Sequence, residues 1–74
     1  MKVYSTPTCR FCAMARELLR RMGVQFQDIN VVSDKEGTRE MIGKSGQSGV
    51  PVIDIQGTII VGFDKDKIES TLQH

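Results

Sequence analysis

The sequence predicts a single α/β domain with the element order strand, helix, strand, helix, strand, strand, helix. Three observations support this order: a helical apolar spacing after Cys9, a β-branched run over residues 50–55, and capping or turn residues between the segments. A chain of 74 residues is long enough for one domain and too short for two. We therefore predict that residues 1–74 form one domain.

The first part of the chain is predicted to form a strand, a helix and a second strand. Residues 2–5 alternate in polarity as a short strand does. A helix is expected over about residues 10–22, because apolar residues recur at i, i+3, i+4 and i+7 and Gly23 follows at the C-cap. These apolar residues are Ala15, Leu18, Leu19 and Met22. Residues 24–31 are expected to form the second strand, with a bulge or an early end near Asp28. The strand–helix–strand unit implies that the first and second strands pair in parallel.

The middle of the chain predicts a second helix and a buried strand. Ser33 and Glu36 fit a capping box, which places a helix over about residues 34–44. Residues 50–55 are rich in β-branched side chains and form a buried strand, with Pro51 at its start, where proline is tolerated.

The last part of the chain predicts a hairpin followed by a helix. Gln56 and Gly57 form a two-residue turn, and residues 58–61 return as an antiparallel strand. Asp64 is a good N-cap for a final helix over about residues 65–73. A parallel pair joined to an antiparallel hairpin, with helices on both faces of the sheet, buries every apolar face predicted above.

Composition argues against several classes of protein. The net charge is +1, so no strong attraction to nucleic acid or to a membrane surface is indicated. No apolar run approaches the ~20 residues of a membrane span, and the first residues do not have the pattern of a signal peptide. Two cysteines at C-x-x-C spacing without an export signal lead us to expect a reducing, cytoplasmic location.

The segment Cys9-Arg10-Phe11-Cys12 lies between the first strand and the first helix, and it contains both cysteines of the chain. The reactive form of cysteine is the thiolate, which a helix N-terminus, a nearby cation and a C-x-x-C arrangement each favour. Cys9 should lie at the helix N-terminus beside Arg10, and Cys12 should lie about one turn further on. This arrangement predicts dithiol–disulfide exchange, with Cys9 as the nucleophile and Cys12 as the resolving thiol.

Other uses of the two cysteines stay open at this point. A structural disulfide would close only a very short loop and would constrain the unfolded chain little. A zinc site needs about four ligands, and His74 is the only further Cys or His, so no metal site is predicted. Small copper carriers have Met-x-Cys-x-x-Cys before a helix, but Pro7 stands at that Met position. A copper- or zinc-binding C-x-x-C carrier module remains the alternative function.

Side chains near the cysteines have two interpretations each. Phe11 either forms an exposed apolar docking surface or packs inward. The arginines of the first helix either form a solvated face, or Arg10 favours the thiolate while the others attract an acidic partner surface. These others are Arg16, Arg20 and Arg21. Separately, the methionines Met14, Met22 and Met41 are expected to fill the core.

Several motifs in register resemble the glutaredoxin branch of the thioredoxin fold. They are the cysteine pair ahead of the first helix, residues 3–6, residues 45–51 with Gly49-Val50-Pro51, and residues 61–64, so the resemblance covers nearly the whole chain. Small bacterial and archaeal glutaredoxin-like proteins and the redoxins that reduce ribonucleotide reductase are similar. The resemblance implies a minimal thioredoxin fold, with a four-stranded mixed sheet in the order 2-1-3-4, and thiol–disulfide oxidoreductase activity.

The resemblance also implies site residues. Pro51 should follow a cis peptide bond, and the backbone of Val50 should pair with the bound thiol substrate. Arg10, Phe11, Gly49 and Asp64 match further substrate-contacting positions. No bound cofactor or metal is implied, glutathione is a candidate reductant or substrate, and the protein should act on disulfide-containing proteins as a monomer.

Departures from the family pattern concern the electron source. Members that use glutathione tend to have Pro-Tyr between the cysteines, where this chain has Arg10-Phe11, and often lysine at the position of Thr6. They have Thr in place of Gly49, and a Gly-Gly-x-Asp-Asp stretch where this chain has residues 61–65, of which Asp64 is retained. The resemblance therefore implies the fold and the exchange chemistry, but leaves open whether glutathione or thioredoxin reductase supplies electrons.

Overall fold

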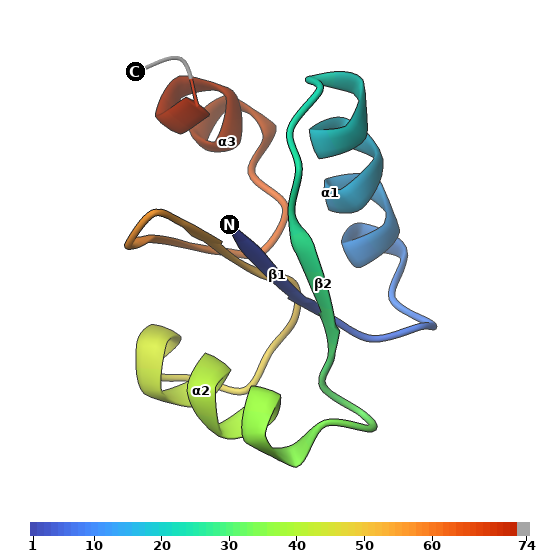
Figure 1. Cartoon of the computed structure of the whole chain (residues 1–74), viewed down its shortest axis with the longest axis vertical. Helices are drawn as coiled ribbons and strands as arrows, with labels where there is room; N and C mark the ends of the chain where they lie inside the picture. The colour runs from blue at the N-terminus through green and yellow to red at the C-terminus, as the bar shows by residue number, and fades with distance from the viewer. Residues whose placement is uncertain (73–74) are drawn as a thin grey trace.

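The computed structural model describes residues 1–72, and its elements follow the predicted order (Figure 1). The strands are β1 (Lys2–Ser5), β2 (Gln27–Asn30), β3 (Val52–Ile55) and β4 (Thr58–Val61). The helices are α1 (Arg10–Arg21), α2 (Lys35–Ser45) and α3 (Lys65–Leu72). The predicted last residue of the final helix, residue 73, and His74 lie outside the described part of the chain.

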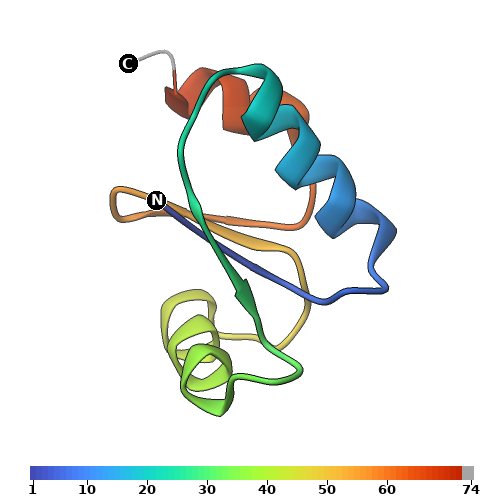
Figure 2. The same ribbon diagram turned by 45° about the vertical axis from the view of Figure 1, so that its right-hand side comes forward.

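The four strands form one mixed sheet in the order β2-β1-β3-β4, which confirms the expected fold. β1 pairs parallel with β2 and antiparallel with β3, and β3 pairs antiparallel with β4. Helices α1 and α3 cover one face of this sheet, and α2 covers the other (Figures 1 and 2). No helix within residues 1–72 is both long enough and apolar enough to cross a membrane.

Two apolar cores lie on the two faces of the sheet, because successive side chains of a strand point to opposite faces. In β1, Val3 belongs to the core beneath α1 and α3, whereas Tyr4 belongs to the core beneath α2. The first core contains Val3, Ala15, Leu19, Ile53, Ile55, Ile60 and Ile68, and the second contains Tyr4, Ile29, Met41 and Val52. Of the three methionines expected in the core, Met41 is buried, but Met14 is 42% exposed.

The end of α1 explains why the second strand is shorter than predicted. The N–H of Gly23 donates to Arg20 O at 3.0 Å, and the N–H of Val24 donates to Leu19 O at 3.0 Å. These two bonds form a Schellman motif, in which Gly23 takes the left-handed conformation at φ 72°. The expected strand over residues 24–31 is therefore wrong at its start, and β2 runs without a bulge from Gln27 to Asn30.

Helix α2 and its N-cap both lie one residue later than predicted. The N-cap is Asp34, whose carboxylate accepts a hydrogen bond from the N–H of Gly37 at 2.9 Å, so the capping box at Ser33 is wrong. A carboxylate satisfies an unpaired N–H of the first turn and complements the helix dipole, which explains why Asp34 takes the position. The helix continues through Gly43 to Ser45, and its C-cap, Gly46, is left-handed at φ 74°.

The C-terminal half agrees closely with expectation. Gln56 and Gly57 both have positive φ, as a two-residue hairpin turn requires. Asp64 Oδ1 accepts a hydrogen bond from the N–H of Lys67 at 3.1 Å and begins α3 as predicted. Strand β3 starts at Val52, two residues later than expected, and Pro51 precedes it.

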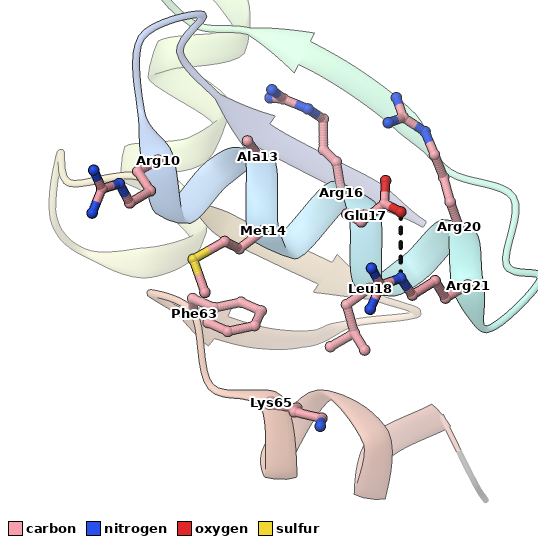
Figure 3. Close-up of a pocket in the computed structure, with 10 residues that line it drawn as sticks. All are labelled: Arg10, Ala13, Met14, Arg16, Glu17, Leu18, Arg20, Arg21, Phe63 and Lys65. Carbon is pink, nitrogen blue, oxygen red and sulfur yellow. Dashed lines mark hydrogen bonds and ion pairs between the residues drawn. The ribbon is translucent and has the colours of Figure 1, made fainter.

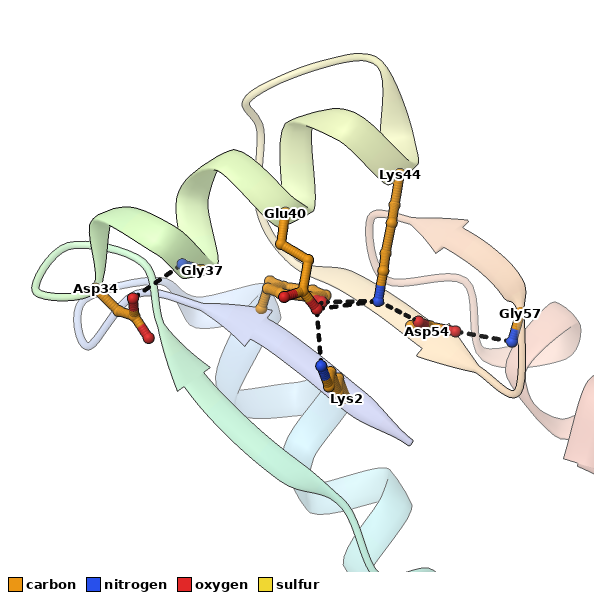
Figure 4. A network of polar contacts seen from close by, with 8 residues as sticks. Lys2, Asp34, Gly37, Glu40, Lys44, Asp54 and Gly57 are labelled. Carbon is orange, nitrogen blue, oxygen red and sulfur yellow. Dashed lines mark hydrogen bonds and ion pairs between the residues drawn. The ribbon is translucent and has the colours of Figure 1, made fainter.

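A network of charged side chains joins α2 to the sheet (Figure 4). Glu40 Oε1 accepts hydrogen bonds from the Lys2 ammonium at 2.8 Å, from the Tyr4 hydroxyl, and from the Lys44 ammonium at 3.1 Å. Lys44 also pairs with Asp54 of β3 at 2.6 Å. The pKa of Glu40 falls to about 2, because Lys2 in particular, and then Tyr4 and Lys44, donate hydrogen bonds to its carboxylate.

Candidate active site

The strand register brings three separate segments of the chain to one edge of the sheet. Tyr4 pairs with Val52, and Val52 pairs with Val61. The chain leaving β1, the chain entering β3 and the chain leaving β4 therefore meet, and the N–H of Gly62 donates to Pro51 O at 2.8 Å. The cysteine turn, residues 49–51 and Asp64 follow or precede these strand ends directly.

Cys9 is the N-cap of α1. Its backbone is extended, at φ −86° and ψ 118°, and its Sγ accepts a hydrogen bond from the N–H of Cys12 at 3.2 Å. An N-cap side chain usually accepts such a bond through oxygen, and here a sulfur takes that place. The first turn of α1 contains no acidic side chain, so a Cys9 thiolate would be the anion that complements this helix terminus.

The surroundings of Cys9 favour its ionised form. Partial burial pulls the pKa of Cys9 upward, but hydrogen bonding from the Cys12 thiol and from the N–H groups of Cys12 and Phe11 outweighs it. The positive charge of Arg16 acts in the same direction. The pKa of Cys9 is therefore lowered from the ordinary value of a cysteine.

Cys12 lies in the opposite environment. It is 0% exposed, and both cysteines are free thiols. Burial, followed by hydrogen bonding to Cys9, raises the pKa of Cys12 to about 11. One sulfur is thus half-buried and readily ionised, and the other is buried and protonated.

The cation that lowers the pKa of Cys9 is Arg16. The sequence suggested Arg10 for this role and, for Arg16, either a solvated face or attraction of an acidic partner surface. Arg16 Nη1 donates to Ser5 Oγ at 2.9 Å, and its Nε lies 3.8 Å from Asp28 Oδ2. Ser5 in turn donates to Asp28 Oδ1 at 2.7 Å. The one signal available in the sequence is that Arg16 follows Cys12 by four residues, which places both on the same side of a helix.

The remaining predicted site residues lie around the two cysteines with different degrees of exposure. Arg10 is exposed, and Phe11 is 57% exposed, so Phe11 does not pack inward. The Val50–Pro51 peptide bond is cis, as the resemblance implied. Pro51 is buried, Val50 is half-buried, and Gly49 is exposed. Asp64 is exposed and engaged as the N-cap of α3.

Within residues 1–72, no three His, Cys, Asp or Glu side chains come together in a way that could hold a metal ion. The two thiols of Cys9 and Cys12 are therefore the chemically distinctive groups of this edge.

Known proteins resemble the chain over most of its length. The glutaredoxin family model matches residues 1–60. A protein of Clostridium pasteurianum, named as an uncharacterised glutaredoxin-like 8.6 kDa protein in the rubredoxin operon, is 47% identical over 73 residues, which cover 99% of this chain and 97% of that protein. Glutaredoxin 3 of Escherichia coli K12 is 36% identical over 64 residues, 86% of this chain and 77% of its own length.

A solved structure confirms the fold independently. The crystal structure of a glutaredoxin from Archaeoglobus fulgidus superposes with a TM-score of 0.89 and covers 99% of this chain and 85% of its own. The sequence identity is 24%, so this likeness concerns the fold alone.

Proposed function

Because the chain belongs to the glutaredoxin family, we propose that it reduces disulfides of proteins, or mixed disulfides of glutathione, through Cys9 and Cys12. The observation that carries this proposal is the contrast between the two sulfurs. Cys9 is half-buried with a lowered pKa, whereas Cys12 is fully buried with a pKa of about 11. A nucleophile and a resolving thiol require this difference.

The first step joins the protein to its substrate. The Cys9 thiolate attacks one sulfur of the substrate disulfide, so that a new S–S bond forms and the substrate S–S bond breaks. The leaving substrate thiolate takes a proton. The N–H of Cys12, which donates to the Cys9 sulfur before the reaction, holds Cys9 at the helix terminus.

The second step releases the substrate. Cys12 loses its proton and attacks the Cys9 sulfur, which breaks the mixed disulfide and forms a Cys9–Cys12 disulfide. The leaving thiolate takes a proton, so the substrate has gained two electrons and two protons in all. Loss of the negative charge from Cys9 in the mixed disulfide removes one of the causes that raise the pKa of Cys12. An external dithiol, or two molecules of a monothiol, then reduces this disulfide to the dithiol and is itself oxidised to a disulfide.

The substrate is held by residues around the cysteines. The backbone of Val50, next to the buried Pro51, would pair with the chain that carries the attacked sulfur. Phe11 would give apolar contact, and Arg10 would attract an anionic group. Gly49 would allow the substrate chain to approach closely, and Asp64 would accept an amine. The reaction needs no bound metal or organic cofactor, and we place it in the cytoplasm and in a monomer.

A coupled assay tests this function and identifies the electron source. NADPH oxidation is followed with a protein disulfide as substrate, in one arm with glutathione and glutathione reductase and in the other with thioredoxin reductase. Turnover in either arm supports the proposal. Absence of turnover in both arms, with the protein fully reduced at the start, would contradict it.

Two single variants test the roles of the cysteines. Cys12→Ser should accumulate a mixed disulfide on Cys9, because the resolving thiol is missing. Cys9→Ser should form none. Trapping on Cys12 in the Cys9→Ser variant would reverse the assignment.

The alternative function is a copper- or zinc-carrying module. The observed order β-α-β-α-β-β-α differs from the β-α-β-β-α-β order of the copper carriers considered above. Titration of the reduced protein with copper(I) or zinc against a competing chelator tests it, since tight stoichiometric binding without disulfide reduction would favour the carrier.

A further inference from the structure

A groove runs along the outer side of α1, beginning next to the cysteine turn (Figure 3). Its volume is about 640 Å³, and it lies between α1 and the segment that leads into α3. In Figure 3, Met14 and Leu18 point from α1 towards Phe63, and these three side chains form an apolar floor. Met14 is 42% exposed, so this floor is open to a ligand.

The border of the groove is strongly cationic. Five of the ten lysines and arginines of the chain line it, against one carboxylate, although the net charge of the chain is only +1. The cations are Arg10, Arg16, Arg20, Arg21 and Lys65, and the carboxylate is Glu17.

Three of these five cations have a carboxylate partner. Arg16 turns away to Ser5 and Asp28, Arg21 forms an exposed ion pair with Glu17 at 3.3 Å, and Lys65 Nζ lies 3.9 Å from Glu69 Oε1. Within the described chain, Arg10 and Arg20 have no ion-pair partner. The groove is thus an apolar floor with a positive border, which is complementary to a ligand that combines carboxylates with an apolar side chain.

The length of the groove indicates the kind of ligand. The 12 residues of α1 span about 18 Å at the rise of an α-helix. An extended peptide covers this distance with about five or six residues. The groove starts at Arg10, the residue after Cys9, so a peptide joined to Cys9 could continue directly into it.

We propose that this groove binds an acidic segment of a protein substrate, about five or six residues long, that flanks the cysteine joined to Cys9. One apolar side chain of the segment packs on Met14, Leu18 and Phe63, and its carboxylates face the cationic border. This inference rests on the proposed disulfide reduction, and it names the feature by which that reaction selects its protein partners.

Three synthetic peptides test the proposal. Each contains the same intramolecular disulfide ring, followed by Glu-Leu-Glu-Glu-Glu, by Gln-Leu-Gln-Gln-Gln or by Glu-Ala-Glu-Glu-Glu. We expect kcat/KM to be about three- to tenfold higher for the first peptide than for the second, since exposed ion pairs contribute little individually and several act together. The third peptide should fall between them, and 0.5 M salt should remove most of the charge preference.

Two lysines of α3 provide a matched pair of variants. Lys65 lines the groove, whereas Lys67 is exposed in the same first turn but does not line it. Lys65→Glu should reduce the preference for the acidic peptide several-fold, and Lys67→Glu, with the same change of net charge, should preserve it.

The outcomes separate this inference from the function on which it rests. Equal rates with all three peptides, or equal loss of preference in both lysine variants, would contradict the proposed binding of acidic segments in the groove. Either result would leave the proposed disulfide reduction intact. Failure to reduce any of the peptides, by a protein that also fails in the coupled assay, would overturn both.

Discussion

The backbone N–H of Cys12 donates a hydrogen bond to the Sγ of Cys9 at 3.2 Å. The same bond caps α1, because Cys9 occupies the N-cap position. Capping of the helix and stabilisation of the thiolate therefore share this contact. A negative charge on Cys9 is favoured by the helix terminus, and the helix terminus is in turn favoured by that charge.

Arg16 should be a positioning residue for this chemistry. Replacing it by methionine, Arg16→Met, removes the positive charge that lowers the pKa of Cys9, so the pKa should rise and the rate of Cys9 alkylation at pH 7 should fall several-fold. Arg16→Lys keeps a charge at this position and should restore part of the rate. Thiol alkylation as a function of pH measures both.

A matched variant distinguishes this effect from a general loss of charge. Arg20→Met removes a cation one turn further along the same helix and should leave the pKa of Cys9 nearly unchanged. If Arg16→Met and Arg20→Met titrate alike, Arg16 has no special role.

Replacement of two glycines of α2 by alanine should change the stability of the protein in opposite directions. A Cβ at Gly37 would lie 2.6 Å from Cγ2 of Ile29, whereas a Cβ at Gly43 would meet no atom within 4 Å. Gly37→Ala should therefore destabilise the protein by about 1–3 kcal/mol through overpacking. Gly43→Ala should stabilise it by roughly 0.5–1 kcal/mol, because alanine favours a helix interior. Urea denaturation measures both, and an equal effect of the two changes would contradict the packing of α2 against β2.

The fold was predictable because local patterns and long-range packing agree. The apolar spacing of α1, the β-branched run of β3 and the Gln56-Gly57 turn each specify one element, and the observed sheet is the arrangement that buries their apolar sides together. The wrong boundaries lie where two local signals compete. Ser33 and Asp34 are both good helix caps, and only the observed bond to Gly37 decides between them.

The candidate site was predictable only in part. The C-x-x-C spacing before a helix was enough to single out Cys9 and Cys12 as candidates. The electrostatic role of Arg16 depends on Ser5 and Asp28 in two different strands, which no local pattern brings together. The groove likewise needs Phe63, a residue distant in sequence from α1, to complete its floor.

Acid should weaken the protein through Glu40. Its pKa is about 2 in the folded protein, well below that of an unfolded chain, so its contribution to stability is complete above about pH 5 and is lost as the pH falls towards 2. Glu40→Gln keeps the shape of the side chain but loses the charge. The variant should be less stable than the original at pH 7, and the difference should vanish near pH 2.

Denaturation midpoints of both proteins between pH 2 and pH 7 measure this effect. A constant difference across the range would mean that the hydrogen bonds to Lys2, Tyr4 and Lys44 matter without the charge of Glu40.

The most direct test of the account is site-resolved alkylation of the reduced protein as a function of pH, with the label located by peptide mass spectrometry. We predict that Cys9 is labelled at a pH below the range of an ordinary cysteine, while Cys12, whose pKa burial raises, is labelled only at a distinctly higher pH. Equal labelling of both cysteines with the profile of an unstructured peptide, or earlier labelling of Cys12, would contradict the division into nucleophile and resolving thiol.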